Sequence, residues 1–165
     1  MYRSRLGKNL GKVTLDYVSS LNDDMEIALY DILGSQAHTI MLYENKIITK
    51  KEIKKILKGL ENLKKEKFEK KSSSEDIHEL IESLIIKRIG IDAGGKMHTA
   101  RSRNDQVALD IRMKIRDDIN IVCQCLLDTI KSLVLLAKKH QETIIPLYTH
   151  LQQAQVGLFS HYLLS

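Results

Sequence analysis

The sequence has one proline, no tryptophan and few aromatic residues among its 165 positions. Proline breaks helices and aromatic residues favour strands, so both scarcities favour helix over sheet. Leucine, isoleucine, lysine and glutamate are abundant instead. A shortage of aromatic rings also leaves little to stack on the bases of a nucleic acid. We therefore predict an all-α fold that does not bind nucleic acid.

Long apolar runs are absent as well. The first residues, "MYRSRLGKNLG", lack the apolar segment of a signal peptide, and the longest purely apolar run, "LVLLA", is too short to cross a bilayer. The only cysteines, Cys123 and Cys125, point to different faces of a predicted helix, which indicates buried free thiols in a reducing compartment. No metal-ligand spacing is present. We predict a soluble cytoplasmic protein with no membrane segment, metal or organic cofactor.

The net charge of +5 comes largely from one lysine-rich stretch, residues 50–71. Its lysines alternate with glutamates and with apolar residues at helical spacing. That pattern predicts an amphipathic helix with a solvated face. A nucleic-acid surface on the same lysines is the less favoured alternative.

The remaining pattern predicts helices separated by short breaks. Capping-box patterns, which satisfy the free N–H groups at a helix start, occur at three places. We expect an irregular arm over about 1–20, a helix over about 19–45, a helix after the box at 49–52, a helix from the box at 72–75 to Gly90, a loop over 91–101, a long helix to His140, and a last helix from the box at 149–152.

The long helix carries an unbroken apolar stripe from Val107 to Ala137. Over 103–140 it would be roughly 55 Å long at about 1.5 Å per residue. Such a rod cannot bury its stripe inside a domain this small, so it needs parallel helices from a bundle or another subunit. The last helix stops at Ser165 within its apolar pattern, without a cap. We therefore expect an N-terminal piece of a longer protein.

Polar residues gather at three predicted helix starts, "SSLNDD", "HTARSRND" and "YTHLQ". Free N–H groups and the helix dipole make helix starts suitable for anions. Arg103 and Asn104 would lie in the first turn of the long helix, where they could flank a carboxylate. Lys96, His98 and Arg101 precede them. A simple cap by Ser102 and Asp105 with surface salt bridges remains open. Since two clusters lie at opposite ends of the long helix, several chains would have to complete a shared site.

Three blocks resemble one enzyme family. "GGKMHTARSRNDQVALDIRM", "YTHLQQAQVGLFSHYLL" and "SSLNDDMEIALYDILGSQAH" are similar, in this order, to segments of the argininosuccinate lyase/delta-crystallin family of the fumarase/aspartase superfamily. The RSRNDQ string distinguishes this family within the superfamily. Ala100 replaces a usual glycine, Val156 a usual proline, and Leu158–Phe159 a basic residue and tryptophan. The family's catalytic serine loop would lie beyond Ser165, so we expect the 165 residues alone to have little or no lyase activity.

The resemblance implies reversible elimination of argininosuccinate to arginine and fumarate, in arginine biosynthesis. It implies a homotetramer whose active sites are shared between subunits around a central helix bundle. On this basis residues 1–103 would form an N-terminal helical domain, and residues 104–165 would begin the bundle domain. A non-catalytic crystallin-like homologue and another superfamily lyase, such as adenylosuccinate lyase, are the alternatives.

The resemblance also implies roles for individual residues. His150 would act in proton transfer, and Thr149 would hold a carboxylate beside it. Substrate binding would fall to Ser20, Asp24, Arg103, Asn104 and His78. His98, Arg101 and Gln106 would support these residues from behind. His38, His140 and His161 receive no role.

Overall fold

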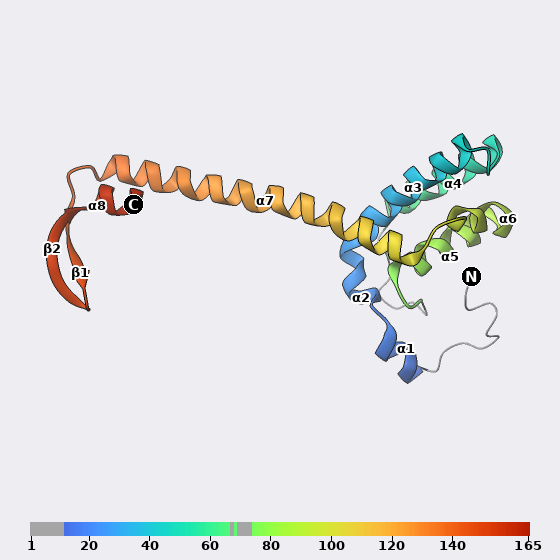
Figure 1. The fold of residues 1–165 in the computed structure, drawn as a ribbon, viewed down its shortest axis with the longest axis horizontal. Coiled ribbons are helices and arrows are strands. Elements are labelled where there is room, and N and C mark those ends of the chain that lie inside the picture. Colours follow the sequence, from blue (N-terminus) through green and yellow to red (C-terminus); the bar gives the residue numbers. More distant parts are fainter. Residues whose placement is uncertain (1–11, 67, 69–73) are drawn as a thin grey trace. The chain divides into compact units, whose positions relative to one another are not determined.

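The structure is a computed structural model that describes residues 12–66, 68 and 74–165 (Figure 1). The chain divides into two compact units, Met1–Lys114 and Ile115–Ser165, and each is described by itself. The described residues are mostly helical, which confirms the predicted fold class. The exception is one antiparallel pair of strands in the second unit.

Helices α3, α4 and α5 form the body of the first unit: α3 packs on α4, and α4 packs on α5. In the described part of this unit the helical elements are α1 (Lys12–Val18), α2 (Leu21–Asp24), the 3₁₀ helix η2 (Met25–Ile27), α3 (Ala28–Glu44), α4 (Lys50–Leu63), α5 (Ile77–Ile89), α6 (Ile91–Gly94), the 3₁₀ helix η3 (Gly95–His98) and the start of α7 (Arg103–Lys139).

The core lies where the apolar faces of these helices meet. The lysine-rich α4 buries one face and exposes its lysines, which confirms the predicted amphipathic helix over residues 50–63. Residues 64–66 lie in a turn, so the helix ends earlier than the lysine-rich stretch. Its buried side chains pack with those of α3 and α5 in a cluster that includes Ile32, Leu42, Ile56, Leu60, Leu63, Ile77, Ile81 and Ile85. Burying several such side chains, each worth about 1.5–3 kcal/mol, stabilises this three-helix arrangement.

The predicted capping box at the start of α4 is confirmed. The Thr49 hydroxyl accepts from the Glu52 N–H at 3.3 Å, and the Glu52 carboxylate accepts from the Thr49 N–H at 2.7 Å. Lys96 donates to the same carboxylate at 2.6 Å. The hydrogen bond from Lys96, and then those from Thr49, lower the pKa of Glu52 to about 2. This cap therefore joins α4 to the segment before α7.

The start of α5 differs from the prediction. Its N-cap is Asp76, whose side chain accepts from the Glu79 N–H at 2.6 Å. Of the expected box at 72–75, residues 72 and 73 lie outside the described part of the chain. The end at Gly90 is confirmed, since this residue takes a φ of 87° that an L side chain rarely adopts.

Two segments expected to be irregular are helical. Residues 12–18 form α1, whereas residues 1–11 of the predicted arm lie outside the described part. Residues 91–98 form α6 and η3 instead of a loop. The paired glycines there misled the prediction because one of them serves close packing: a Cβ on Gly94 would lie 2.9 Å from the Ile86 Cα of α5.

Helix α7 has the predicted position and length, 37 residues, and it crosses the boundary between the units. Most of its apolar stripe is exposed: Ile119 is 54% exposed and Leu126 58%. The cysteines on α7 are exposed too, so the prediction of buried thiols was wrong for this chain. An 18-residue stretch of α7 has a mean hydropathy of 1.7, so by length and composition α7 could cross a membrane. A helix from the interior of a soluble bundle has the same composition.

The second unit holds a hairpin where a last helix was expected. Strand β1 (Ile144–Thr149) pairs antiparallel with β2 (Gln152–Leu158), and the short α8 (Phe159–Leu164) follows. The capping-box prediction at 149–152 was therefore wrong. Thr149 pairs with Gln152, and the two residues between them have φ values of 51° and 61°, as a two-residue hairpin turn requires. Pairing of two strands outweighed a four-residue capping signal.

Candidate functional site

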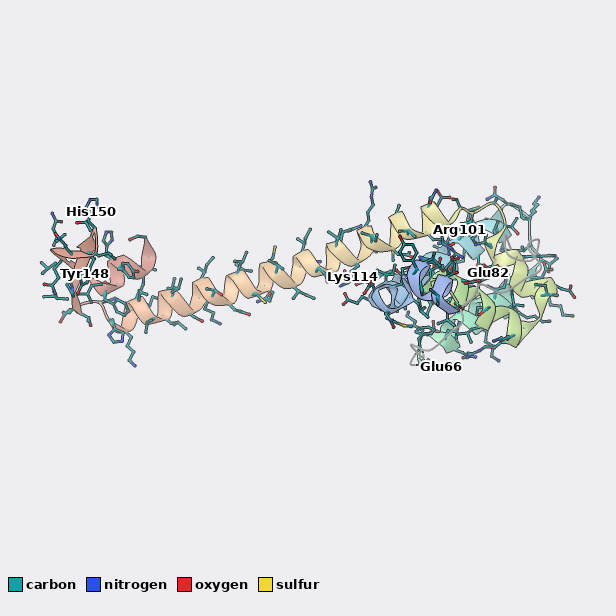
Figure 2. All side chains as sticks on the ribbon, turned by 90° about the horizontal axis from the view of Figure 1, so that it is seen from below. Glu66, Glu82, Arg101, Lys114, Tyr148 and His150 are labelled. Carbon is teal, nitrogen blue, oxygen red and sulfur yellow. The ribbon has the colours of Figure 1, made fainter. Side chains whose placement is uncertain are left out.

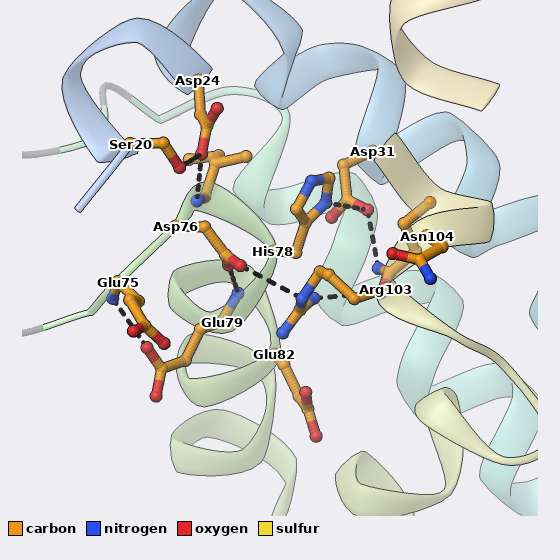
Figure 3. A network of polar contacts seen from close by, with 12 residues as sticks. Ser20, Asp24, Asp31, Glu75, Asp76, His78, Glu79, Glu82, Arg103 and Asn104 are labelled. Atoms are coloured by element: carbon orange, nitrogen blue, oxygen red, sulfur yellow. Dashed lines mark hydrogen bonds and ion pairs between the residues drawn. The ribbon is translucent and has the colours of Figure 1, made fainter. Parts of the chain in front are cut away.

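The predicted polar clusters of the first unit meet at the N-terminus of α5 (Figure 3). The Ser20 hydroxyl donates to the Asp24 carboxylate at 2.7 Å, and the same carboxylate accepts from the Ile77 N–H at 3.4 Å. The Ser20 N–H donates to the Glu75 carbonyl at 3.0 Å. Ser20 and Asp24, which are far from α5 in sequence, are thus fixed against the start of this helix.

Arg103 reaches the same helix end from the first turn of α7. Its Nε lies 3.1 Å from the carboxylate of Asp76, the α5 cap, and its Nη1 donates to Gln106 Oε1 at 3.0 Å (Figure 3). A guanidinium has five N–H groups. Within the described part of the chain, these contacts use two of them, and the side chain is 34% exposed. Arg103 is therefore held in place with donors left for a carboxylate.

Asn104 lies beside Arg103 and is exposed. Its N–H donates to the Ser102 hydroxyl at 3.2 Å, and the Asp105 carboxylate accepts from the Ser102 N–H at 3.1 Å. Ser102 and Asp105 thus cap α7, as expected. The cap leaves the side chains of Arg103 and Asn104 available, so capping and anion binding are compatible at this helix start.

A buried polar cluster lies behind Arg103, on three helices of the first unit. His78 Nδ1 of α5 lies 3.0 Å from Asp31 Oδ1 of α3 and 3.5 Å from Asp110 Oδ2 of α7. Gln106 Nε2 donates to Asp31 Oδ1 at 2.9 Å. All four residues are at most 2% exposed. Among the residues that the structure describes, neither ring nitrogen of His78 has a well-aligned hydrogen-bond partner, and neither carboxylate oxygen of Asp110 has one.

Two close carboxylates in a buried cluster repel each other. Burial first, and then the charge of Asp31, raise the pKa of Asp110 to about 7, against the opposing effects of His78 and Arg101. Burial lowers the pKa of Arg101, although both carboxylates partly offset this. The ligand atoms of Asp31, His78 and Asp110 lie within 4.8 Å of one another, so these three could hold a metal ion. Arg101 already supplies a positive charge to the same carboxylates.

The loop before α7 places the remaining predicted residues of the first unit. Arg101 donates to the Ser35 hydroxyl at 2.8 Å and lines an open pocket of about 440 Å³ that does not include Arg103. Burial lowers the pKa of His98, and Glu82, 4.0 Å away, opposes this shift. Ala100 has a φ of 54°, a conformation that costs an L residue about 1–2 kcal/mol and that glycine adopts freely.

Thr149 lies in the second unit, where it pairs with Gln152 at the end of the hairpin. His150 follows it in the turn (Figure 2). Both are exposed, and His150 has a φ of 51°. Leu151, beside it in the turn, is 99% exposed. The positive φ values of His150 and Leu151 are those that the hairpin turn requires, and each costs an L residue about 1–2 kcal/mol.

The histidines without an assigned role make ordinary contacts. His38 Nε2 lies 2.9 Å from the Thr99 carbonyl, and His140 Nδ1 lies 3.2 Å from the Thr143 hydroxyl with its ring edge on Phe159. His161 is exposed on α8.

Three residues of this site were not predicted from the sequence: Asp31, Asp76 and Asp110. A signal for them exists. Asp31 follows Ala28 and precedes Ile32 on the buried face of α3, and Asp110 lies beside the apolar stripe of α7. A charged residue at a core-facing position needs a buried partner. Asp76 with Glu79 also forms a capping pattern that the preceding serines obscured.

Comparison with known proteins identifies the family. The family model described as "Lyase" matches residues 11–165. A protein of Nitrosopumilus maritimus named "Argininosuccinate lyase" is 72% identical over 165 residues, which is 100% of this chain and 34% of that protein. Proteins of the same name from Methanocaldococcus jannaschii and Caldanaerobacter subterraneus are 46% and 42% identical, over 99% and 100% of this chain and 34% and 38% of their own length.

The chain thus spans little more than a third of the length of the curated relatives it matches. The match covers both units, from α1 through the long helix to the hairpin. On this evidence the chain belongs to the lyase family.

Proposed function

We propose that this chain is the N-terminal part of an argininosuccinate lyase, which cleaves argininosuccinate reversibly to arginine and fumarate in arginine biosynthesis. The observation that carries the proposal is the 72% identity, over the whole chain, to a relative named for that reaction. The resemblance of three separate sequence blocks supports it. The protein would act in the cytoplasm.

The geometry at the start of α7 suits this chemistry. In the elimination, a base removes a proton next to a carboxylate, which gains negative charge in the transition state. Fixed cations and amides stabilise such charge best when they are already oriented. Arg103 is held by Asp76 and Gln106, and Asn104 beside it is exposed, so these two residues would bind the succinyl carboxylates. Ser20 and Asp24, at the same end of α5, would contact the arginine portion.

The remaining roles follow the same proposal. Thr149 would hold a carboxylate and His150 would act in proton transfer. His78 would serve the substrate site, and His98, Arg101 and Gln106 would support it. His78 is 1% exposed, so it would act from behind the surface rather than from an open cleft.

The exposed apolar surface of α7 supports an oligomer. A long helix with an exposed apolar stripe needs neighbouring helices to cover that stripe. We propose that residues 104–165 pack with other copies in a homotetramer, following an N-terminal domain of residues 1–103. Sites shared between subunits would bring Thr149 and His150 to the Arg103 of another chain.

A chimera tests the function directly. We would join these 165 residues to the part of the Nitrosopumilus maritimus relative that the match does not cover, and follow fumarate release from argininosuccinate at 240 nm. We expect turnover within about tenfold of the intact relative. A folded, tetrameric chimera without turnover would contradict the proposal.

A matched pair of variants tests the site. Arg103→Lys keeps the charge but loses the planar fork, so kcat/KM should fall about a hundredfold or more. Arg112→Lys, on an exposed turn of α7, is the control and should change kcat/KM by less than about threefold. Adenylosuccinate as substrate separates this reaction from that of the alternative lyase.

A further inference from the structure

Gln106 uses both ends of its side-chain amide. It is 2% exposed and lies three residues after Arg103 on α7, so the two side chains share a helix face. Its Oε1 accepts from Arg103 Nη1 at 3.0 Å, and its Nε2 donates to Asp31 Oδ1 at 2.9 Å. The amide therefore links a buried carboxylate of α3 to the guanidinium at the start of α7.

The carboxylate of Asp31 decides which way this amide points. An amide has an acceptor at one end and donors at the other. A carboxylate can only accept, so it orients the NH₂ of Gln106 toward itself and the oxygen toward Arg103. A reversed amide would place two donors against each other at Arg103, and two acceptors against each other at Asp31. Nδ1 of His78 also lies 3.0 Å from Asp31 Oδ1.

Asp76 fixes a second side of the same guanidinium. Its carboxylate lies 3.1 Å from Arg103 Nε, whereas Gln106 accepts from Nη1. Contacts on two different nitrogens define the plane of the guanidinium as well as its position. The donors that these contacts do not use then point in one defined direction.

We propose that Asp31 and Gln106 are positioning residues that aim the free donors of Arg103 at a carboxylate of the bound substrate. This inference rests on the proposed function, in which Arg103 binds that carboxylate. Neither Asp31 nor Gln106 touches the substrate, because both are buried. They act through Arg103.

Kinetics of the chimera separate positioning from packing. Gln106→Leu fills similar space without either hydrogen bond, and kcat/KM should fall at least about tenfold while the chimera remains folded. Gln124→Leu, an exposed glutamine of the same helix, is the control and should change kcat/KM by less than about threefold. A kcat/KM of Gln106→Leu within about threefold of the native chimera would overturn the proposal.

An exchange of partners supplies the rescue. Gln106→Glu keeps an acceptor toward Arg103 but places a second carboxylate against Asp31, so kcat/KM should fall. In the double variant with Asp31→Asn, residue 31 carries the amide and residue 106 the carboxylate. Residue 31 then donates to residue 106, which still accepts from Arg103. The double variant should return to within about threefold of the native kcat/KM. A double variant whose kcat/KM is no higher than that of Gln106→Glu alone would overturn the proposal that Asp31 and Gln106 position Arg103.

Nuclear magnetic resonance of the 165-residue chain tests the positioning without any activity. In the native chain, rotation of the Arg103 guanidinium should be slow enough to give separate Nη1 and Nη2 signals, and Gln106→Leu should average them. If the Arg103 guanidinium rotated at the same rate in the native chain and in Gln106→Leu, the proposal would be overturned even if the chimera were active. An inactive chimera with the expected signals would instead count against the proposed function alone. If the native chain bound one divalent metal ion per chain and Asp110→Asn bound none, the buried cluster would be a metal site. That result would also overturn the proposal that Asp31 and Gln106 position Arg103.

Discussion

Asp110 offers the sharpest test of the buried cluster, because its environment predicts a pH dependence of stability. The groups that face it are Asp31 from α3, His78 from α5 and Arg101 from the loop before α7. Burial and the charge of Asp31 raise its pKa from 3.8 to about 7. The folded chain therefore binds a proton that the unfolded chain has already released at pH 5.

The sign follows from that difference. Since the folded state binds more protons between about pH 4 and 7, the free energy of unfolding falls as the pH rises through this range. From pH 5 to 8 the loss is about 1.36 kcal/mol for each of the two pH units below the folded pKa, or about 3 kcal/mol in all. Above about pH 7 this contribution is constant. The stabilisation is fully present below about pH 4.

Asp110→Asn keeps the shape of the protonated side chain and removes the titration. We expect the variant, relative to the native chain, to gain about 3 kcal/mol in free energy of unfolding between pH 5 and pH 8. Urea unfolding followed by circular dichroism at both pH values measures this change. Asp92→Asn, an exposed carboxylate on α6, is the control and should show no such change. A difference between native and Asp110→Asn that is the same at both pH values would refute the reasoning.

Three further changes test other parts of the first unit. Gly94→Ala would place a Cβ 2.9 Å from the Ile86 Cα and should lower the free energy of unfolding by about 1–3 kcal/mol in urea; an unchanged value would contradict the close packing of α6 on α5. The native chain should lose stability as the pH falls from about 4.5 to about 2, because the hydrogen bond from a lysine ammonium lowers the pKa of Glu52. In Glu52→Gln this loss should be smaller. A loss of unfolding free energy equal to that of the native chain would count against the cap. Asp76→Ala should cost about 1 kcal/mol of stability through the lost cap to the Glu79 N–H, and Asp76→Asn, which keeps an acceptor, should cost less; equal losses in thermal unfolding would argue against capping.

Much of the helical architecture could be predicted because it depends on local signals. The capping box of α4 and the glycine that ends α5 involve residues a few positions apart, so their chemistry can be seen in the sequence. The apolar stripe of α7 repeats over about nine turns at about 3.6 residues each and leaves no alternative period. The failures came where a local signal competed with a distant partner. The hairpin of β1 and β2 replaced a predicted helix because the backbone groups of the two strands form hydrogen bonds with each other.

The candidate site divides in the same way. Arg103, Asn104, Ser20 and Asp24 were predicted from motif and resemblance, and the structure brings them to one end of α5 within the first unit. That Asp76 would join these clusters could not be predicted, because its partner lies on another helix. Thr149 and His150 lie in the second unit, so their roles remain predictions.

The sequence by itself determined the helical class, the long α7, the chemical character of the helix starts and the family resemblance. These are properties of neighbouring residues and of repeated patterns along the chain. Tertiary structure alone decided that Asp31, His78 and Asp110, from three helices, share one buried cluster and that Gln106 connects it to Arg103. The reason is physical: carboxylates are costly to bury singly, and only packing of the helices shows which distant groups surround them.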